Sequence, residues 1–250
     1  MFVNIKEVYE KGYFLGKLDD FDLNFFKGII NLHFQNNLKK NNIIFDDEIC
    51  NYHKLKISLD KHKSLWPKEN RILNYTDYKK FLGTEFFIYL RSLFGSFEIS
   101  DENNIGHPEI YFRIVRPYPY SDVTSLHSDS WFRHLGHGNM PEDCNSIKFW
   151  FSIYPPEKSS NSKLGFRFVP NSHNNKLKYD KVFSDGIYKP VLDEQKNHIE
   201  TVSLKGDAGS FIVFHDDLVH GGEVIQSDTT RCSFEFSLWA KKDSINSLVS

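Results

Sequence analysis

The chain has 250 residues, of which 40% are hydrophobic, 16% aromatic and 26% charged. This composition supplies enough apolar material for a sizeable core and excludes an intrinsically disordered chain. The formal net charge of −2 gives no overall electrostatic reason to expect nucleic acid or an anionic membrane as a partner.

Residues 1–106 are predicted to be largely helical. Apolar residues recur at helical spacing from Asp22 to Leu38. A second helical run begins at Thr76, and Gly95 is a suitable residue to end it. The polar segments NNLKKNNIIFDDE and HKSLWPKEN are expected to be connections.

From residue 107 to residue 242, short β-branched or aromatic runs alternate with turn residues. The runs are EIYFRIVRP, VTSLHSD, SIKFWFSIY, GFRFVP, IETVSL, GSFIVF and TRCSFEFSLWA. They predict a mainly β core, a sandwich or barrel, and not alternating βα units. The polar stretch 171–197 is expected to be a surface excursion or a lid. We expect one domain over residues 1–250, with the helical part packed on the β core.

The cysteine pattern and the N-terminus favour a protein of the reducing cytoplasm. Cys50, Cys144 and Cys232 lie far apart and form no CxxC pair, which argues against a disulfide framework or a zinc site. The first residues lack the basic segment and apolar run of a signal peptide. No apolar stretch reaches the length of about 18 residues that a membrane helix needs, so we expect no membrane insertion.

Two segments carry candidate metal ligands. LHSDSWF places His127 and Asp129 two residues apart, so on a strand both side chains would point to the same face. Taken alone this spacing is common by chance, and the alternative is a polar pair on the surface. The segment KGDAGSFIVFHDDLVHGG adds His220 after an apolar strand. Two histidines and one carboxylate on one face form the facial triad of non-haem Fe(II) oxygenases, which leaves three positions of an octahedral iron open.

Arg231 follows His220 by eleven residues, on the next apolar strand. The planar guanidinium of a buried arginine binds a carboxylate through two parallel hydrogen bonds. Ser233 lies two residues further, on the same face of that strand, where its hydroxyl could share the carboxylate.

The order of these motifs resembles the 2-oxoglutarate-dependent dioxygenases, and more narrowly the phytanoyl-CoA hydroxylase-like (PhyH) superfamily. The matching pieces extend from about residue 111 to residue 239. FRFVPNSH is similar to a family segment that ends in Pro-Gly-Ser-His, with Asn171 where glycine is usual. The resemblance implies a double-stranded β-helix, a jelly roll of the cupin kind.

The resemblance also implies a cofactor and a reaction. Fe(II) would be held by His127, Asp129 and His220, and the co-substrate 2-oxoglutarate would be anchored by Arg231 and Ser233. With O2 this implies release of succinate and CO2 and hydroxylation of an unactivated C–H bond. Relatives that halogenate lack the carboxylate ligand, so Asp129 favours hydroxylation or a related oxidation such as desaturation.

Other histidines offer alternatives. His215 and Asp217 form a second HxD, and His215 could replace His220 as the distal ligand. The glycines after His220 and its spacing to Arg231 favour His220. His134 and His137 in RHLGHG could form a second metal site, but a polar loop at the rim is the simpler interpretation.

Four residues are candidates for contact with a small-molecule substrate: Arg113, Arg116, Trp131 and His134. Arg113 and Arg116 lie three apart on one strand, so one should face the pocket and the other should form a surface ion pair. Together with the lysines of 176–196 they suggest an anionic substrate, such as a sugar acid, a nucleotide-linked sugar or a phosphonate.

Two other functions fit the same pattern. An iron oxygenase of the cupin type that does not use 2-oxoglutarate would leave Arg231 with a structural role or a role in substrate binding. A non-catalytic jelly-roll binding module would bind neither iron nor 2-oxoglutarate. The substrate and the oligomeric state are not indicated by the sequence.

Overall fold

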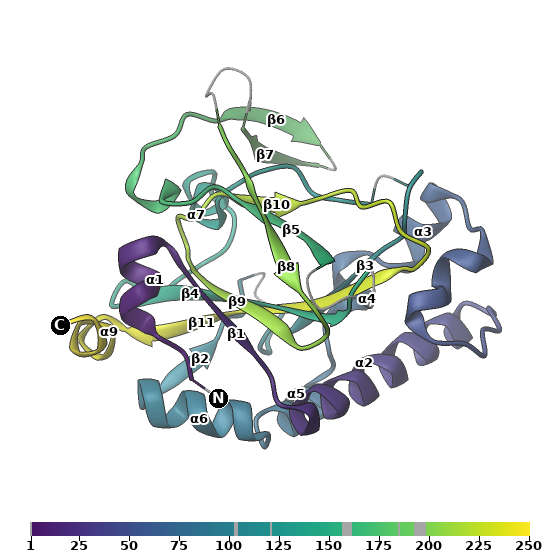
Figure 1. Ribbon diagram of the computed structural model, residues 1–250, viewed down its shortest axis with the longest axis horizontal. Coiled ribbons are helices and arrows are strands. Elements are labelled where there is room, and N and C mark those ends of the chain that lie inside the picture. Colours follow the sequence, from purple (N-terminus) through teal and green to yellow (C-terminus); the bar gives the residue numbers. More distant parts are fainter. Residues whose placement is uncertain (1, 103–104, 121, 157–161, 185, 193–198) are drawn as a thin grey trace.

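The computed structural model describes residues 2–102, 105–120, 122–156, 162–184, 186–192 and 199–250. Its centre consists of two antiparallel sheets that pack face to face (Figure 1). The main sheet has the order β1-β9-β4-β11-β2, with β3 also paired to β11, and the smaller sheet has the order β10-β5-β8. A separate hairpin, β6–β7, lies beyond the smaller sheet.

The strand bounds are as follows. The main sheet contains β1 (Tyr13–Lys17), β2 (Phe97–Ile99), β3 (Tyr111–Val115), β4 (Cys144–Tyr154), β9 (Ser210–His215) and β11 (Arg231–Lys241). The smaller sheet contains β5 (Ser162–Phe168), β8 (Val202–Gly206) and β10 (His220–Gly222). The hairpin consists of β6 (Asp180–Ser184) and β7 (Ile187–Val191). The mainly β core with a helical N-terminal part is confirmed.

Alternation along β4 sends its side chains to two different surroundings. One set is apolar and packs against helices on the outer face of the main sheet: Ile147, Phe149, Phe151 and Ile153. The other set faces the smaller sheet and is largely polar: Ser146, Lys148, Trp150 and Ser152. β4 therefore has an apolar outer face and a largely polar inner face, and its inner face is available for chemistry.

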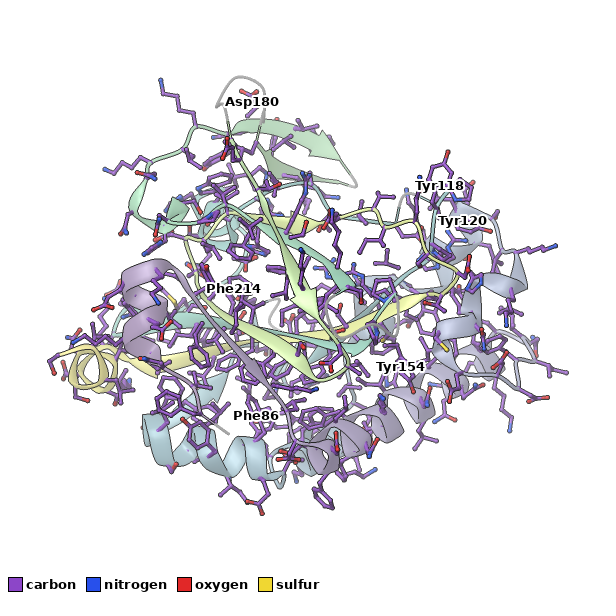
Figure 2. All side chains as sticks on the ribbon, in the orientation of Figure 1. Phe86, Tyr118, Tyr120, Tyr154, Asp180 and Phe214 are labelled. Atoms are coloured by element: carbon purple, nitrogen blue, oxygen red, sulfur yellow. The ribbon has the colours of Figure 1, made fainter. Side chains whose placement is uncertain are left out.

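Helices cover the outer face of the main sheet (Figure 1). They include α2 (Asp20–Lys40), α5 (Tyr75–Phe81) and α6 (Glu85–Phe94). Phe26 of α2 packs against Phe234 of β11, with ring centroids 4.9 Å apart. Figure 2 places Phe86 on this helical side and Phe214 on the opposite side of the main sheet. Each fully buried phenylalanine stabilises the fold by about 1.5–3 kcal/mol.

Two strands of the main sheet come from the part of the chain that was predicted to be largely helical. β1 pairs with β9 along its whole length, and β2 pairs with the end of β11. Both strands are short, and tertiary pairing outweighs their weak local signal. The N-terminal part therefore helps to build the sheet that carries the candidate site.

The helical prediction was correct for α2 but wrong in detail further along. The expected run from Thr76 to Gly95 is two helices, because the chain turns at Gly83 and the extended Thr84 is the N-cap residue before α6. HKSLWPKEN, expected to be a connection, contains most of α3 (Leu59–Leu65) and part of α4 (Lys68–Arg71).

The remaining elements are α1 (Ile5–Lys11), η1 (Ile49–Leu55), α7 (Asp129–His134), η2 (Ser172–Asn174) and α9 (Lys242–Val249). Asn171, just before η2, has φ of +59°, which explains why glycine or asparagine suits this position. Ser172 then accepts a hydrogen bond from the Val219 amide at 2.8 Å, which braces the residue before His220. Within the described parts of the chain, no helix is long and apolar enough to cross a membrane.

Acid should destabilise the metal-free protein. Burial lowers the pKa of His62 to about 4, an effect that the nearby Asp122 carboxylate only partly offsets, and burial also lowers that of His127 to about 4. Unfolded histidines bind a proton below about pH 6.5, whereas these two stay neutral until about pH 4. Lowering the pH through this window therefore favours the unfolded state, by up to about 1.4 kcal/mol per pH unit and histidine.

Urea denaturation at about pH 7 and about pH 5 measures this effect. The free energy of unfolding should be lower at the acidic pH, and His62→Gln should reduce the difference. An unfolding free energy that is equal or higher at about pH 5 would contradict the prediction.

Candidate active site

Three side chains of the metal-ligand type converge in the structure: His127, Asp129 and His220. Their candidate ligand atoms all lie within 4.8 Å of one another. Nε2 of His127 lies 3.8 Å from Oδ1 of Asp129, and Nε2 of His220 lies 3.9 Å from Oδ2 of Asp129. Two atoms that bind one ion at about 2.1 Å can be at most about 4.2 Å apart, so both pairs are close enough to share an ion.

Backbone pairing places the two histidines opposite each other. The His127 amide donates to the His220 carbonyl at 2.9 Å, and the His220 amide donates to the His127 carbonyl at 2.8 Å. The prediction of a strand over VTSLHSD is wrong, because His127 forms only an isolated β-bridge and α7 begins at Asp129. Ser128 between them is extended, so the two side chains still approach one point.

Both histidine rings are oriented by hydrogen bonds to the backbone. Nδ1 of His127 lies 2.8 Å from the Ser125 carbonyl, and Nδ1 of His220 lies 3.0 Å from the Leu218 carbonyl. A carbonyl can only accept, so each Nδ1 carries the proton and each Nε2 keeps its lone pair. This is the arrangement that metal-binding histidines commonly have. Burial, with a further contribution from His220, holds the pKa of His127 at about 4, so its ring is neutral.

Lys148 is a residue of the site that the sequence interpretation missed. It projects from the inner face of β4, and its side chain is only 6% exposed. Its ammonium lies 2.8 Å from the Glu102 carboxylate, donates to Oγ of Ser237 at 2.6 Å and lies 3.6 Å from Asp129. The sequence signal that could have identified it is a lysine within the strand-like run SIKFWFSIY.

Lys148 affects the charge of the candidate metal ligand. Burial by itself would raise the pKa of Asp129, but Lys148 and the two histidines hold it well below its ordinary value. Asp129 is therefore a carboxylate, the form that binds a metal ion.

The other histidine candidates lie elsewhere. His215 packs against Tyr9 and His173, with ring centroids 5.1 Å and 5.4 Å away, and its Nδ1 lies 3.7 Å from Asp217. His137 bonds to the Tyr188 carbonyl at 2.9 Å. Among the described residues, only the His127 group brings three possible ligands together.

Arg231 and Ser233 lie on the inner face of β11, and each has a buried polar atom without a protein partner. Arg231 is 6% exposed, and its Nη1 donates to the Gly165 carbonyl at 2.8 Å. Within the described chain, its Nε and the Ser233 hydroxyl have no hydrogen-bond partner. Buried polar atoms are normally satisfied, so these two indicate a missing polar ligand. A carboxylate would satisfy both, which fits the expected co-substrate.

Gly165 makes room for Arg231, a requirement that the sequence did not reveal. Its φ is +78°, and a Cβ there would lie 2.9 Å from Cδ and Nε of Arg231. Gly165→Ala should therefore displace the guanidinium and strain the backbone. We expect a loss of about 1–3 kcal/mol in unfolding free energy and weaker binding of 2-oxoglutarate.

Gly28→Ala is the matched control for this prediction, because Gly28 lies in α2 and a Cβ there would meet nothing within 4 Å. That change should stabilise the helix by up to about 1 kcal/mol. Urea denaturation and calorimetric titration with 2-oxoglutarate measure both effects. Equal outcomes for the two variants would show that Gly165 has no special role.

The two candidate arginines of the substrate pocket have different surroundings. Arg113 lines the cavities beside the triad and forms an ion pair with Glu235 of β11. Arg116 is 2% exposed and binds Asp122 through two hydrogen bonds of 2.7 Å and 2.9 Å. The expected surface ion pair is therefore wrong, because the chain after β3 folds back and buries Arg116 with its partner.

The other two candidates for substrate contact are not positioned for it. Trp131 is buried and stacks on Tyr179, with ring centroids 4.5 Å apart. His134 is exposed at the end of α7. Neither lines the two cavities that border His127 and Asp129.

Two adjoining cavities border the triad. The inner one is lined by the triad together with Arg231 and Trp150. The outer one has a volume of about 600 Å³, within the range of small-molecule sites. The β6–β7 hairpin contributes Ile187, Lys189 and Pro190 to its wall, so the described part of the 171–197 excursion reaches the cavity.

Solved structures with low sequence identity share the fold. SnoK from nogalamycin biosynthesis, described as a non-heme alpha ketoglutarate dependent carbocyclase, is 13% identical with a TM-score of 0.53, covering 95% of this chain and 83% of that chain. AviO1 from Streptomyces viridochromogenes Tue57 is 13% identical with a TM-score of 0.52, covering 96% and 94%. ThoJ, described as a non-heme monooxygenase, is 13% identical with a TM-score of 0.52, covering 94% and 77%.

Sequence comparison identifies the family. No curated protein sequence matches the chain. The family model of phytanoyl-CoA dioxygenase (PhyH) matches residues 60–233, well over half of the chain. The matched segment includes the three residues of the triad, Arg231 and Ser233. The chain therefore belongs to the phytanoyl-CoA dioxygenase (PhyH) family.

Proposed function

We propose that this protein is a non-haem Fe(II)- and 2-oxoglutarate-dependent dioxygenase that hydroxylates an unactivated C–H bond of a small or carrier-linked molecule. One observation carries the proposal. The three candidate ligands and Arg231 line one inner cavity, and the unsatisfied polar atoms of Arg231 and Ser233 lie on the same face of β11. Family membership and the shared fold support the same reaction class.

In this proposal, each polar group of the site has a defined role. His127, Asp129 and His220 would hold Fe(II), a set of two histidines and one carboxylate that suits oxygen chemistry. Arg231 and Ser233 bind the distal carboxylate of 2-oxoglutarate and so set the direction from which the co-substrate approaches. The Lys148 ammonium, 3.6 Å from the Asp129 carboxylate, keeps that carboxylate ionised.

Bound Fe(II) would supply the oxygen chemistry, in which one atom of O2 enters the succinate formed as 2-oxoglutarate loses CO2 and the other enters the substrate. The chain orients the reactants and limits the access of water. Phe166 stacks on the His220 ring at 5.4 Å, and Phe132 packs edge-on against the His127 ring at 5.4 Å. These aromatic contacts fix the ligand rings and shield them from solvent.

The substrate is expected to be anionic, in the manner of a sugar acid or a phosphonate, and to occupy the outer cavity of about 600 Å³. Arg113 and Arg116 are each neutralised by a carboxylate, so they do not account for an anionic substrate. The expectation of an anionic substrate therefore depends on other cations on the cavity wall.

Succinate formation tests the proposal. The protein is supplied with Fe(II), 2-oxoglutarate and O2, with and without a panel of small acids, and succinate is quantified. We expect slow succinate formation without substrate and faster formation with an accepted substrate. A protein that binds neither Fe(II) nor 2-oxoglutarate by calorimetry would contradict the proposal. An iron oxygenase independent of 2-oxoglutarate would oxidise substrate without forming succinate.

A further inference from the structure

The wall of the outer cavity combines residues from distant parts of the chain. His127 and Asp129 line one part of it, and Lys68 and Arg71 of α4 line another. Tyr111 of β3 also lines the cavity, and Lys68 and Arg71 lie over its ring. A molecule in the cavity can therefore contact α4 and the metal ligands at the same time.

Most cations on this wall are already neutralised. Arg113 pairs with Glu235, and Arg133 pairs with Asp216. Lys68 lies 3.0 Å from the Glu109 carboxylate, which is almost fully buried. These ion pairs leave little free positive charge for a ligand.

Arg71 differs from its neighbours. Its Nε donates to the Trp66 carbonyl at 3.1 Å, and no carboxylate of the described residues forms an ion pair with it. Both Nη groups therefore remain available for a ligand. Arg71 is only partly exposed, and an anion bound to it would supply the close ion-pair partner that it lacks among the described residues.

The surroundings of Arg71 reinforce this charge. Lys68, Arg71 and Arg113 all lie over the Tyr111 ring, at 5.2 Å, 5.9 Å and 5.5 Å from its centroid. Burial lowers the pKa of Arg71 to about 10, and the charge of Arg113 adds to this effect. The guanidinium is still fully protonated at neutral pH, and an anion would relieve the repulsion between the two arginines.

We infer that Arg71 binds an oxyanion of the substrate, a carboxylate or a phosphate-type group, while the rest of the substrate extends toward His127 and Asp129. This inference rests on the proposed function and adds the recognition site for the substrate's charge. Two Nη groups can bind two oxygens of one oxyanion in parallel, which sets orientation as well as affinity. The co-substrate carboxylate would be bound separately at Arg231.

Small anions test the inference. The protein, loaded with Mn(II) in place of Fe(II) and saturated with 2-oxoglutarate, is titrated calorimetrically with methylphosphonate, acetate and the neutral acetamide. We expect at least one anion to bind and acetamide not to bind. The anion that binds more tightly shows whether the site prefers the tetrahedral group of methylphosphonate or the planar group of acetate. Failure of both anions to bind the wild-type protein would overturn the inference.

Three variants locate the bound anion. Arg71→Gln should weaken binding at least tenfold, and Arg71→Lys should retain part of it. Arg71 also borders a second cavity of about 290 Å³, which Lys63 lines but which the triad does not. Lys63→Gln is therefore the matched control and should bind as the wild type does. Equal binding by wild type and Arg71→Gln, or an equal loss in Lys63→Gln, would overturn the inference.

A separate readout distinguishes this inference from the proposed function. Fe(II) and 2-oxoglutarate together should produce a charge-transfer absorption band in the wild type and in Arg71→Gln alike. Absence of the band in the wild type would count against the proposed function, whatever the anion titrations show. Loss of the band only in Arg71→Gln would mean that Arg71 binds the co-substrate, and it would overturn the inference. Melting temperatures identify any variant that fails to fold.

Discussion

His220→Ala should abolish iron binding, whereas His215→Ala should leave it intact. Nε2 of His220 lies 3.9 Å from the Asp129 carboxylate, and the two His–His backbone hydrogen bonds aim it at His127. His215 instead contacts Tyr9 and Asp217. Loss of a residue that only orients a ligand costs about 10–100-fold in metal affinity, so loss of the ligand itself should cost at least about 100-fold.

The two variants are well matched, because each replaces one histidine by alanine and the two histidines lie close together in the sequence. Anaerobic titration with Fe(II), followed by the charge-transfer band with 2-oxoglutarate, measures the result directly. Melting temperature without metal shows whether either variant is misfolded. If His215→Ala lost iron and His220→Ala kept it, the ligand assignment would be reversed and the proposed triad would be wrong.

Arg231→Met should weaken 2-oxoglutarate binding by about 2–5 kcal/mol, which is at least about thirtyfold, while Fe(II) still binds. Methionine keeps much of the apolar volume but removes the charge. The guanidinium is buried beside Gly165 and 5.8 Å from the centre of the Trp150 ring. Ser233→Ala should have a smaller effect, of about 1.5–3 kcal/mol, because it removes one hydrogen bond to a charged group.

This prediction also separates two roles for Arg231. A purely structural arginine would lower the unfolding free energy when it is replaced, and the affinity for 2-oxoglutarate would not change. Replacement of an anchor for the co-substrate would weaken 2-oxoglutarate binding and leave the unfolding free energy largely unchanged. The second role is favoured because burial lowers the pKa of Arg231 to about 10 and its Nε has no partner among the described residues. Calorimetry with 2-oxoglutarate, together with urea denaturation of the metal-free variant, distinguishes the two. Unchanged affinity would favour the oxygenase that does not use 2-oxoglutarate.

Strand predictions succeeded where a local pattern is strong. The runs SIKFWFSIY and TRCSFEFSLWA became β4 and β11, which pair along most of their length. Their alternation was enough to place Arg231 and Ser233 on one face. The HxD segment failed as a strand because a helix begins at Asp129, but the spacing of its side chains still brings them together.

The sequence by itself determined the reaction class. The roles proposed for His127, Asp129, His220 and Arg231 follow from residue type and from the order and spacing of motifs, which are visible in a linear chain. Tertiary structure alone decided what surrounds them. Lys148 lies 3.6 Å from Asp129, nineteen positions away in the chain, and Arg71 reaches the cavity from α4.

The physical reason is that charge pairing depends on distance in space. Arg113 and Arg116 looked equivalent in sequence, yet Glu235 and Asp122 neutralise them, and these partners could not be read from the strand that carries them. Arg71 had no recognisable motif, but folding left it without a carboxylate partner in the described chain. Local patterns therefore predict where reactive groups occur, and only the fold decides which charges remain free to bind a ligand.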